Sequence, residues 1–478
     1  MGSGIIAGIA TILPFSIYLT GMVLAFMAFL GKPRWATLFI VWVLPLRNVV
    51  DRMHEFPMGK DFLDILILSA ILGWIISAMS ERRPIFEKSP LNAISAIVIG
   101  YTYISLWRGY FYLSYFTPFD FFDPRLQEWK NYITLPILHF LTINTVRDRK
   151  WIWRFVAVIS VSFFLVNFYT IRQISLFSSI ESRVKINGTL MFLGPNELAA
   201  FINQYAVLFL SLFFAIRFNL RKLWLGLIIA MSFYCVAFLF SRGAYLGLVA
   251  GLFFIFALRK RILLIPLLLL VVCWQAALPQ KVKDRILMTT NEYGELDLSN
   301  QKRIEVWEQS LNLFKHDPIM GVGFAVFISL GFILGDTHNI YLKMLAEQGM
   351  VGFLIFFFLI ILFIKQGWSL YQKAEDPLFK ALGVGFVGCI VTLMVNNVFG
   401  NRWSYLEMSS NLWVFAGLVS RALIVIQEEK KNPSPPQKKT SKRIPQKIKK
   451  RVQGPPPEFS ILKRKTGTLR RWGHRESD

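Results

Sequence analysis

Apolar runs close to 20 residues recur along almost the whole chain, and they constrain its fold more than any other feature. A helix of about 20 apolar residues is long enough to cross a bilayer core of about 30 Å. A segment in lipid must satisfy its own backbone hydrogen bonds, and a helix does so within one segment. Only 17% of the residues are charged, fewer than a soluble protein of this size carries. The sequence therefore predicts an all-α polytopic membrane protein.

We expect twelve or thirteen transmembrane helices. The first two predicted spans are the least regular, because Pro14 and Pro45 interrupt them. The first run lacks a basic leading segment and a small-residue cleavage site, so we expect a retained helix. The predicted spans are 5–30, 34–47, 61–79, 90–107, 131–145, 151–173, 196–217, 222–240, 243–258, 261–277, 339–365, 378–399 and 406–426.

Lys and Arg in short loops predict the orientation, because such loops favour the cytoplasmic side. The basic loops 81–88, 146–151, 216–222 and 258–262 alternate correctly with one another along the predicted spans. We therefore place these loops in the cytoplasm. The connections between them then face outward, and the longest of these is 278–338.

The chain ends in a strongly basic segment. Residues 427–478 hold 16 Lys and Arg against five Asp and Glu, together with PSPP and GPPP. Few apolar residues and high net charge are typical of disorder. We expect residues 1–426 to form the membrane domain and 427–478 to form a disordered cytoplasmic tail that contacts anionic lipids. No nucleic-acid recognition fold accompanies the charge, so we expect no nucleic-acid partner.

Several arginines lie in the connections that we place outside, against the tendency of basic residues to stay in the cytoplasm. Arg242 is the clearest case, because it stands in a short turn between two apolar runs and cannot move far from the membrane surface. Arg183, Arg303 and Arg402 lie in similar polar islands. Arginine stays charged and can hold phosphate oxygens with two parallel hydrogen bonds. Ordinary solvated arginines remain the alternative.

The long outer connection contains an amphipathic segment, KRIEVWEQSLNLFKH. Ile304, Trp307, Leu311 and Phe314 recur at helical spacing, which predicts a helix on the bilayer surface. Arg303 stands one turn before Trp307, on the same side. The segment ends at Pro318, where two following glycines allow a tight turn.

A polar stretch, GDTHNIYLKMLAEQGMVG, opens the next apolar run. Asp336 or Thr337 can cap this helix, and His338 is predicted in its first turn. A neutral imidazole accepts a proton near its usual pKa of about 6.5, although a packed histidine is the common alternative. Asn196, which follows Pro195 at another predicted helix start, is either a simple cap or part of a site.

Outward arginines with one histidine suggest a chemistry at the outer leaflet. A polyprenyl-diphosphate sugar offers phosphates at that depth, and arginines would stabilise the charge on its leaving diphosphate. Histidine would take the proton of an attacking sugar hydroxyl. No nucleotide-binding fingerprint appears, as suits a donor that is already activated. No grouping of carboxylates and histidine requires a metal, so we expect neither a metal nor a cofactor.

The order of these motifs resembles the O-antigen ligase and polysaccharide polymerase superfamily over about residues 180–400. The motifs are short, and their order and common outward placement carry the resemblance. They are Arg-x3-Asn-Gly…Pro-Asn (183–196), Ser-Arg-Gly (241–243), Arg-x3-Trp (303–307), Pro-x2-Gly-x-Gly (318–323) and His-Asn-x-Tyr-Leu…Glu-x-Gly-x2-Gly (338–352).

The resemblance implies a GT-C-like, metal-independent, inverting glycosyltransferase of the bacterial inner membrane with a periplasmic active site. Its donor would be an undecaprenyl-diphosphate-linked glycan. His338, Arg242 and Arg183 would be its catalytic residues. The resemblance further implies that the substrate is contacted by Arg303, Asn196, Asn339, Glu347 and Lys185.

The acceptor separates two functions within this superfamily. An O-antigen ligase of lipopolysaccharide biosynthesis uses the lipid A-core, and a polymerase uses a second lipid-linked repeat unit. We favour the ligase slightly. The alternative from another class is a transporter of lipid-linked glycans, which would place ionisable residues deep in the spans and show paired repeats. Neither feature stands out in the sequence.

Overall fold

The computed structural model describes residues 2–114, 122–177, 179, 181–191, 193–288, 298–330 and 336–431. These residues form seventeen α-helices, several short 3-10 turns and no strand, which confirms the all-α class. The helices are α1 (Gly2–Phe29), α2 (Pro33–Val43), α3 (Arg47–Asp51), α4 (Phe62–Ser80), α5 (Pro90–Tyr112), α6 (Pro124–Thr145), α7 (Arg149–Leu176), α8 (Pro195–Ala215), α9 (Leu220–Phe238), α10 (Arg242–Arg259), α11 (Leu264–Val272), α12 (Trp274–Ala277), α13 (Gln280–Leu287), α14 (Leu298–His316), α15 (Ile340–Lys373), α16 (Pro377–Asn396) and α17 (Leu406–Lys431).

Ten of the described helices are long and apolar enough to cross a membrane: α1, α4, α5, α7 to α10 and α15 to α17. The chain is thus a multi-pass membrane protein, and its described residues hold fewer full spans than the expected twelve or thirteen. The predicted span 34–47 covers all but the first residue of α2, and the 11 residues of this helix are too few to cross a bilayer core. The predicted span 131–145 lies within α6, which begins with several charged residues. The predicted span 261–277 is broken into a 3-10 turn, α11 and α12.

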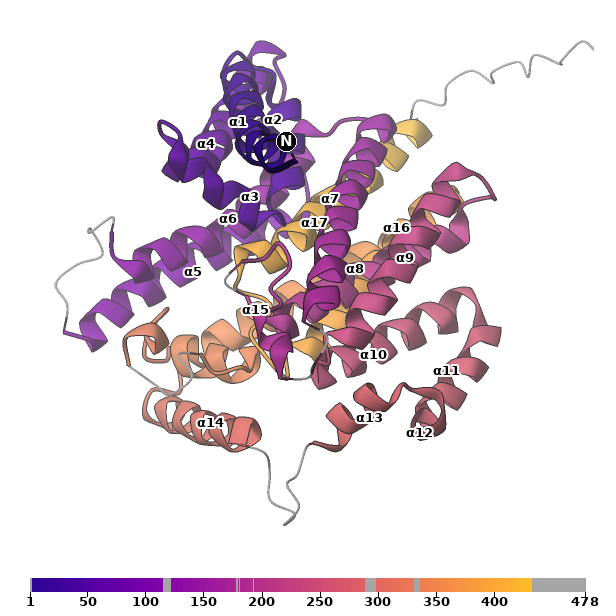
Figure 1. Ribbon diagram of the computed structural model, residues 1–478. Helices are drawn as coiled ribbons and strands as arrows, with labels where there is room; N and C mark the ends of the chain where they lie inside the picture. The colour runs from indigo at the N-terminus through magenta and orange to yellow at the C-terminus, as the bar shows by residue number, and fades with distance from the viewer. Residues whose placement is uncertain are drawn as a thin grey trace, which may run out of the picture. The chain divides into compact units, whose positions relative to one another are not determined.

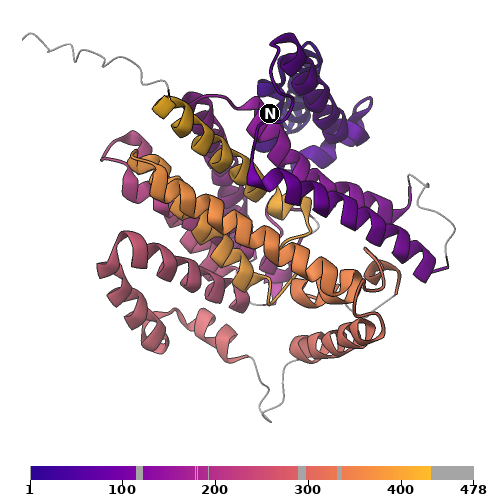
Figure 2. The ribbon, with the colours of Figure 1, turned by 180° about the vertical axis from the view of Figure 1, so that it is seen from behind.

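Two helices form the centre of the bundle. The apolar windows of α8 and α17 are 83% and 94% buried inside the protein, whereas those of α1 and α10 are each 28% buried. α8 packs against α16, α10 and α9, and α17 packs against α6 and α15 (Figure 1). Figure 2 shows α15 and α17, in orange and yellow, running through the middle of the view. The apolar side chains left exposed on the outer helices are those that lipid would cover.

A break in α15 holds the turn at residues 318–323. Gly349 has a backbone φ of +64°, inside a helix that otherwise continues. The N–H of Val322 donates to the carbonyl of Ala346 at 2.9 Å, so the turn satisfies a carbonyl next to the break. A β-carbon at Gly349 would lie 2.3 Å from the carbonyl oxygen of Ile319, which leaves room only for glycine. The break and the turn therefore depend on each other.

The predicted amphipathic helix is present as α14, but its buried face differs from the expected one. Val306 and Ser310 are each 1% exposed, whereas Ile304 of the expected apolar stripe is 40% exposed. The indole N–H of Trp307 donates to the carbonyl of Thr337 at 3.0 Å. α14 therefore packs against α15 and the loop before it, because these offer a protein surface that the periodicity of α14 alone does not reveal.

The basic tail was expected to begin at residue 427. Residues 427–431 continue α17, and the remainder of the predicted tail, 432–478, lies outside the described residues.

Candidate functional site

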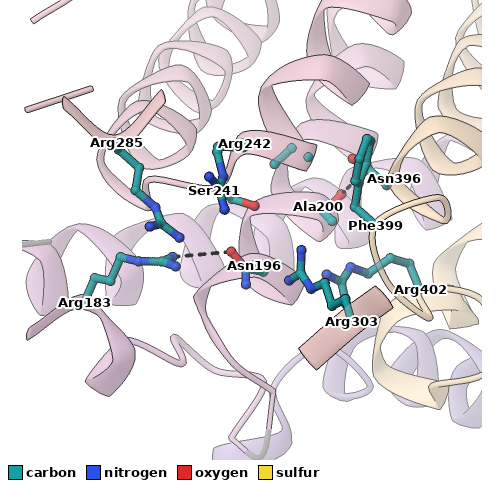
Figure 3. A pocket seen from close by; sticks show the side chains of 12 residues that line it. Arg183, Asn196, Ala200, Ser241, Arg242, Arg285, Arg303, Asn396, Phe399 and Arg402 are labelled. Carbon is teal, nitrogen blue, oxygen red and sulfur yellow. Dashed lines mark hydrogen bonds between the residues drawn. The ribbon is translucent and has the colours of Figure 1, made fainter. Parts of the chain in front are cut away.

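A cavity next to the N-termini of α8 and α10 is lined by five arginines (Figure 3). None of the described residues that line it is acidic. The remaining lining comes mainly from small or neutral side chains. The full lining is Arg183, Arg242, Arg285, Arg303, Arg402, Asn196, Ala200, Ser241, Gly243, Ala244, Asn396 and Phe399. We call this space the arginine cavity.

Each of the five arginines comes from a different segment of the chain. Figure 3 shows Arg183 and Arg285 on one side of Asn196, and Arg303 and Arg402 on the other. The five segments are the 3-10 turn Ser182–Lys185, the first residue of α10, α13, α14 and the loop before α17. Packing of the whole bundle is therefore needed to assemble this positive charge.

Two helix N-termini add to the positive potential. The first turn of α8 contributes Asn196 to the lining, and the first turn of α10 contributes Arg242 and Gly243. Neither N-cap, Gly194 for α8 or Ser241 for α10, makes a side-chain capping bond within the described residues. A helix N-terminus carries a partial positive charge and free N–H groups, which suit an anion.

Arg183 is held in place by neutral partners. Its side chain donates to the Asn196 side-chain oxygen at 3.3 Å and to the Leu239 carbonyl at 3.0 Å. Burial, followed by the nearby charge of Arg285 and then of Arg242, lowers the pKa of Arg183 to about 10. The guanidinium is still protonated at neutral pH. An anion in the cavity would offset this repulsion between like charges.

Asn196 does not have the capping role that the sequence left open. Gly194 is the N-cap of α8, and Asn196 lies in the first turn with its side chain at the cavity wall. Its contact with Arg183 links α8 to the 3-10 turn.

Arg402 pairs with a carboxylate that does not itself line the cavity. Its Nη1 contacts Oε1 of Glu197 in α8, and the two side chains are 5% and 14% exposed. Its backbone N–H donates to the side chain of Asn397 at 2.9 Å. The Nε of Arg402 is buried without a hydrogen-bond partner in the described part of the chain. Glu197 thus holds Arg402 at the cavity wall and leaves one donor of its guanidinium unused.

His338 lies just before α15 rather than in its first turn. The N-cap is Asn339, whose side chain accepts from the N–H groups of Tyr341 and Leu342 at 3.0 and 3.2 Å. His338 therefore has a non-helical backbone, with φ at +49°. The expected caps Asp336 and Thr337 lie further upstream. The resemblance assigned Asn339 to substrate binding. In the structure its side-chain oxygen caps the N-terminus of α15 instead.

The imidazole of His338 lies close to the charged groups of the arginine cavity without lining it. Burial is the largest cause that lowers its pKa. The charges of Arg303 and Arg402 lower it further, and those of Asp336 and Glu197 act in the opposite direction. The net result is a pKa below the usual 6.5, so the imidazole is neutral at pH 7 and able to accept a proton.

Two other predicted residues lie away from the arginine cavity. Glu347 is fully buried, 3.6 Å from the amine of Lys343, and accepts from the N–H of Phe327 at 3.3 Å. The bond from Phe327 ties α15 to the segment that follows the turn at 318–323. Lys185 is exposed, and its amine lies 5.7 Å from the centre of the Phe177 ring.

Two of the cavity arginines were not predicted as site residues. Arg402 was recognised only as an outward arginine, and Arg285 was missed. Arg285 lies in α13, and its Nε donates to the carbonyl of Phe240 at 3.2 Å. The available signal was its place in the outer connection 278–338, the same signal that singled out Arg303.

Comparison with known proteins agrees with the motif order. Residues 226–357 match the family model described as O-Antigen ligase. The match includes Arg242, Arg285, Arg303 and His338, whereas Arg183 lies before it. The search of curated proteins found no match. This match supports, over residues 226–357, the resemblance to the O-antigen ligase superfamily.

Proposed function

We propose that the protein transfers a glycan from undecaprenyl diphosphate to an acceptor hydroxyl, at the periplasmic face of the bacterial inner membrane. The acceptor we propose is the lipid A-core, so the protein would act as an O-antigen ligase. The single observation that carries the proposal is the arginine cavity, where five guanidinium groups and two helix N-termini surround one small space.

The arginine cavity suits a diphosphate better than other ligands. Guanidinium groups bind phosphate oxygens with short, charge-assisted hydrogen bonds. Arg183 and Arg402 are buried, so their charge is poorly screened by water. As the bond between sugar and diphosphate breaks, negative charge grows on the leaving oxygen, and these groups stabilise it. This fixed positive charge would take the role that a divalent cation has in other glycosyl transfers.

The proposed reaction is a single displacement. The acceptor hydroxyl oxygen forms a bond to the anomeric carbon, and the bond from that carbon to the diphosphate oxygen breaks. The electron pair of that bond leaves with the diphosphate. The hydroxyl proton passes to the neutral imidazole of His338, whose pKa is lowered in part by the charges of Arg303 and Arg402. A displacement from the opposite face inverts the anomeric configuration.

Transfer by the purified full chain tests the proposal. The protein is placed in liposomes with an undecaprenyl-diphosphate glycan and is offered lipid A-core in one arm and a second lipid-linked repeat unit in the other. One discrete conjugate with lipid A-core supports a ligase, and a ladder of products identifies a polymerase. Movement of the intact donor across the bilayer without any new bond would identify a transporter.

Matched variants test the site itself. Arg242→Lys keeps the charge but loses the planar fork, so we expect kcat/KM to fall about tenfold or more. His338→Ala should abolish transfer. Lys185→Ala is the control, because this exposed cation lies outside the arginine cavity. Transfer by His338→Ala at the parent rate would remove the imidazole from the mechanism.

A further inference from the structure

A second cavity, of about 330 Å3, lies against α6. Its size falls within the range of about 300–1,000 Å3 that ligand pockets show. Four parts of the chain line it: the start of α3, the first turns of α6, the loop before α8, and the loop that leads into α17 together with the first turn of α17. Its polar lining consists of Arg47, Gln127, Glu128, Asn131, Ser404, Tyr405 and Glu407. We call it the α6 cavity.

The loop before α17 contributes lining residues to both cavities, and we call this loop their shared wall. In the loop before α17, Arg402 lines the arginine cavity, and Ser404 and Tyr405 line the α6 cavity. The hydroxyl of Tyr405 donates to the carboxylate of Asp336 at 3.4 Å. Asp336 is an electrostatic neighbour of His338. The proposed base therefore lies close to the wall between the two cavities.

The chemistry of the α6 cavity differs from that of the arginine cavity. Arg47, the basic residue in its lining, lies 3.6 Å from the carboxylate of Glu407. Glu128 adds a second carboxylate, 3.7 Å from the amine of Lys343. The lining therefore holds two carboxylates and one guanidinium, which disfavours a phosphate.

Carboxylates and amides suit the hydroxyl groups of a sugar. Carboxylates accept hydrogen bonds, and amides both accept and donate. The side chain of Asn131 is exposed and has no hydrogen bond in the described portion of the chain. It is therefore available to a ligand. A few polar groups that converge on a partly apolar pocket fix the orientation of a bound molecule.

We propose that the α6 cavity binds the acceptor glycan, and this inference rests on the proposed glycosyl transfer. The terminal sugar lies against Glu128, Asn131 and Tyr405, with its reactive hydroxyl directed toward the shared wall. The donor diphosphate lies in the arginine cavity on the other side of that wall. The donor thus binds in the positively charged arginine cavity and the acceptor in the α6 cavity, where carboxylates predominate. His338 lies near the wall between them.

Kinetics of two α6 variants test this assignment. Asn131→Ala and Gln127→Ala each remove an amide from the α6 cavity. We expect each to raise the KM for the acceptor roughly two- to tenfold, the effect of one hydrogen bond, with the KM for the donor unchanged. Lys130→Ala is the control on the same helix, because its amine pairs with Asp64 and does not line the cavity. An unchanged acceptor KM in both variants would overturn the proposal.

Crosslinking provides a measurement that needs no turnover. A photo-crosslinking amino acid replaces Asn131 in the full-length protein, and a second variant carries it at Lys130. The probes are delipidated core oligosaccharide and a lipid-linked repeat unit, each offered alone. A crosslink at position 131 and none at 130 supports the α6 cavity, and its probe identifies the acceptor. Absence of both crosslinks refutes this inference, whereas absence of transfer by the parent protein refutes the proposed function.

Discussion

Removal of Glu197 tests whether the arginine cavity is built for an anion. This carboxylate pairs with Arg402 at the cavity wall, and the two side chains are 14% and 5% exposed. In Glu197→Ala, the positive charge of Arg402 stays buried without its partner. We therefore expect the variant to fold with reduced stability and to gain more than the parent from an added anion.

The magnitude follows from the burial of the pair. Loss of one partner of a buried ion pair lowers the free energy of unfolding by about 3–5 kcal/mol. The control is Glu81→Ala, since Glu81 also pairs with an arginine, Arg147, but its side chain is 45% exposed. An exposed pair contributes at most about 1 kcal/mol. The difference between the two variants isolates the effect of burial.

The assay measures thermal unfolding in detergent with and without inorganic pyrophosphate, at ionic strength matched with chloride. A ligand at 100 times its Kd stabilises a folded protein by about 2.7 kcal/mol. Without the Glu197 carboxylate beside the cavity, pyrophosphate should bind more tightly and raise the Tm of Glu197→Ala more than that of the parent. An equal or smaller rise in the variant would show that Arg402 does not face the anion.

Two further predictions concern the base and the fold. Because burial lowers the pKa of His338, the transfer rate should rise with pH through a midpoint below 6.5 and then stay level. Arg303→Gln removes a positive charge that lowers the pKa of His338, so the midpoint in a pH–rate profile should move upward. An unchanged midpoint would contradict an electrostatic effect of Arg303 on His338. Gly349→Ala places a β-carbon 2.3 Å from the carbonyl of Ile319 at a φ of +64° and should lower the free energy of unfolding by about 3 kcal/mol. In the control Gly100→Ala no atom outside the adjacent backbone of its own helix lies within 4 Å of the new β-carbon, so thermal unfolding of the two variants should differ clearly.

The helical class could be predicted because it depends on local composition. An apolar run of sufficient length must form a helix in lipid, whatever its neighbours are. The three predicted spans that did not become full spans show where this reasoning stops. The segment 131–145 is apolar enough to suggest a helix, but it continues α6, whose polar first turns contribute to the α6 cavity.

The site was predicted in part, for a similar reason. Arg183, Arg242 and Arg303 could be selected because a positive charge in a connection that is predicted to face outward departs from a general tendency. The same sequence signal was present at Lys185, and the structure leaves that residue exposed and outside the arginine cavity. A charge out of place is visible in sequence, but the direction of its side chain is not.

By itself, the sequence determined that the chain crosses the membrane repeatedly as helices and carries cations where they are unusual. Both properties belong to single segments. Only the tertiary structure decided that five arginines from five segments share one cavity, and that Glu347 accepts a hydrogen bond from the N–H of Phe327. These depend on contacts between residues as far apart as Glu197 and Arg402, which are determined by helix packing and not by local periodicity.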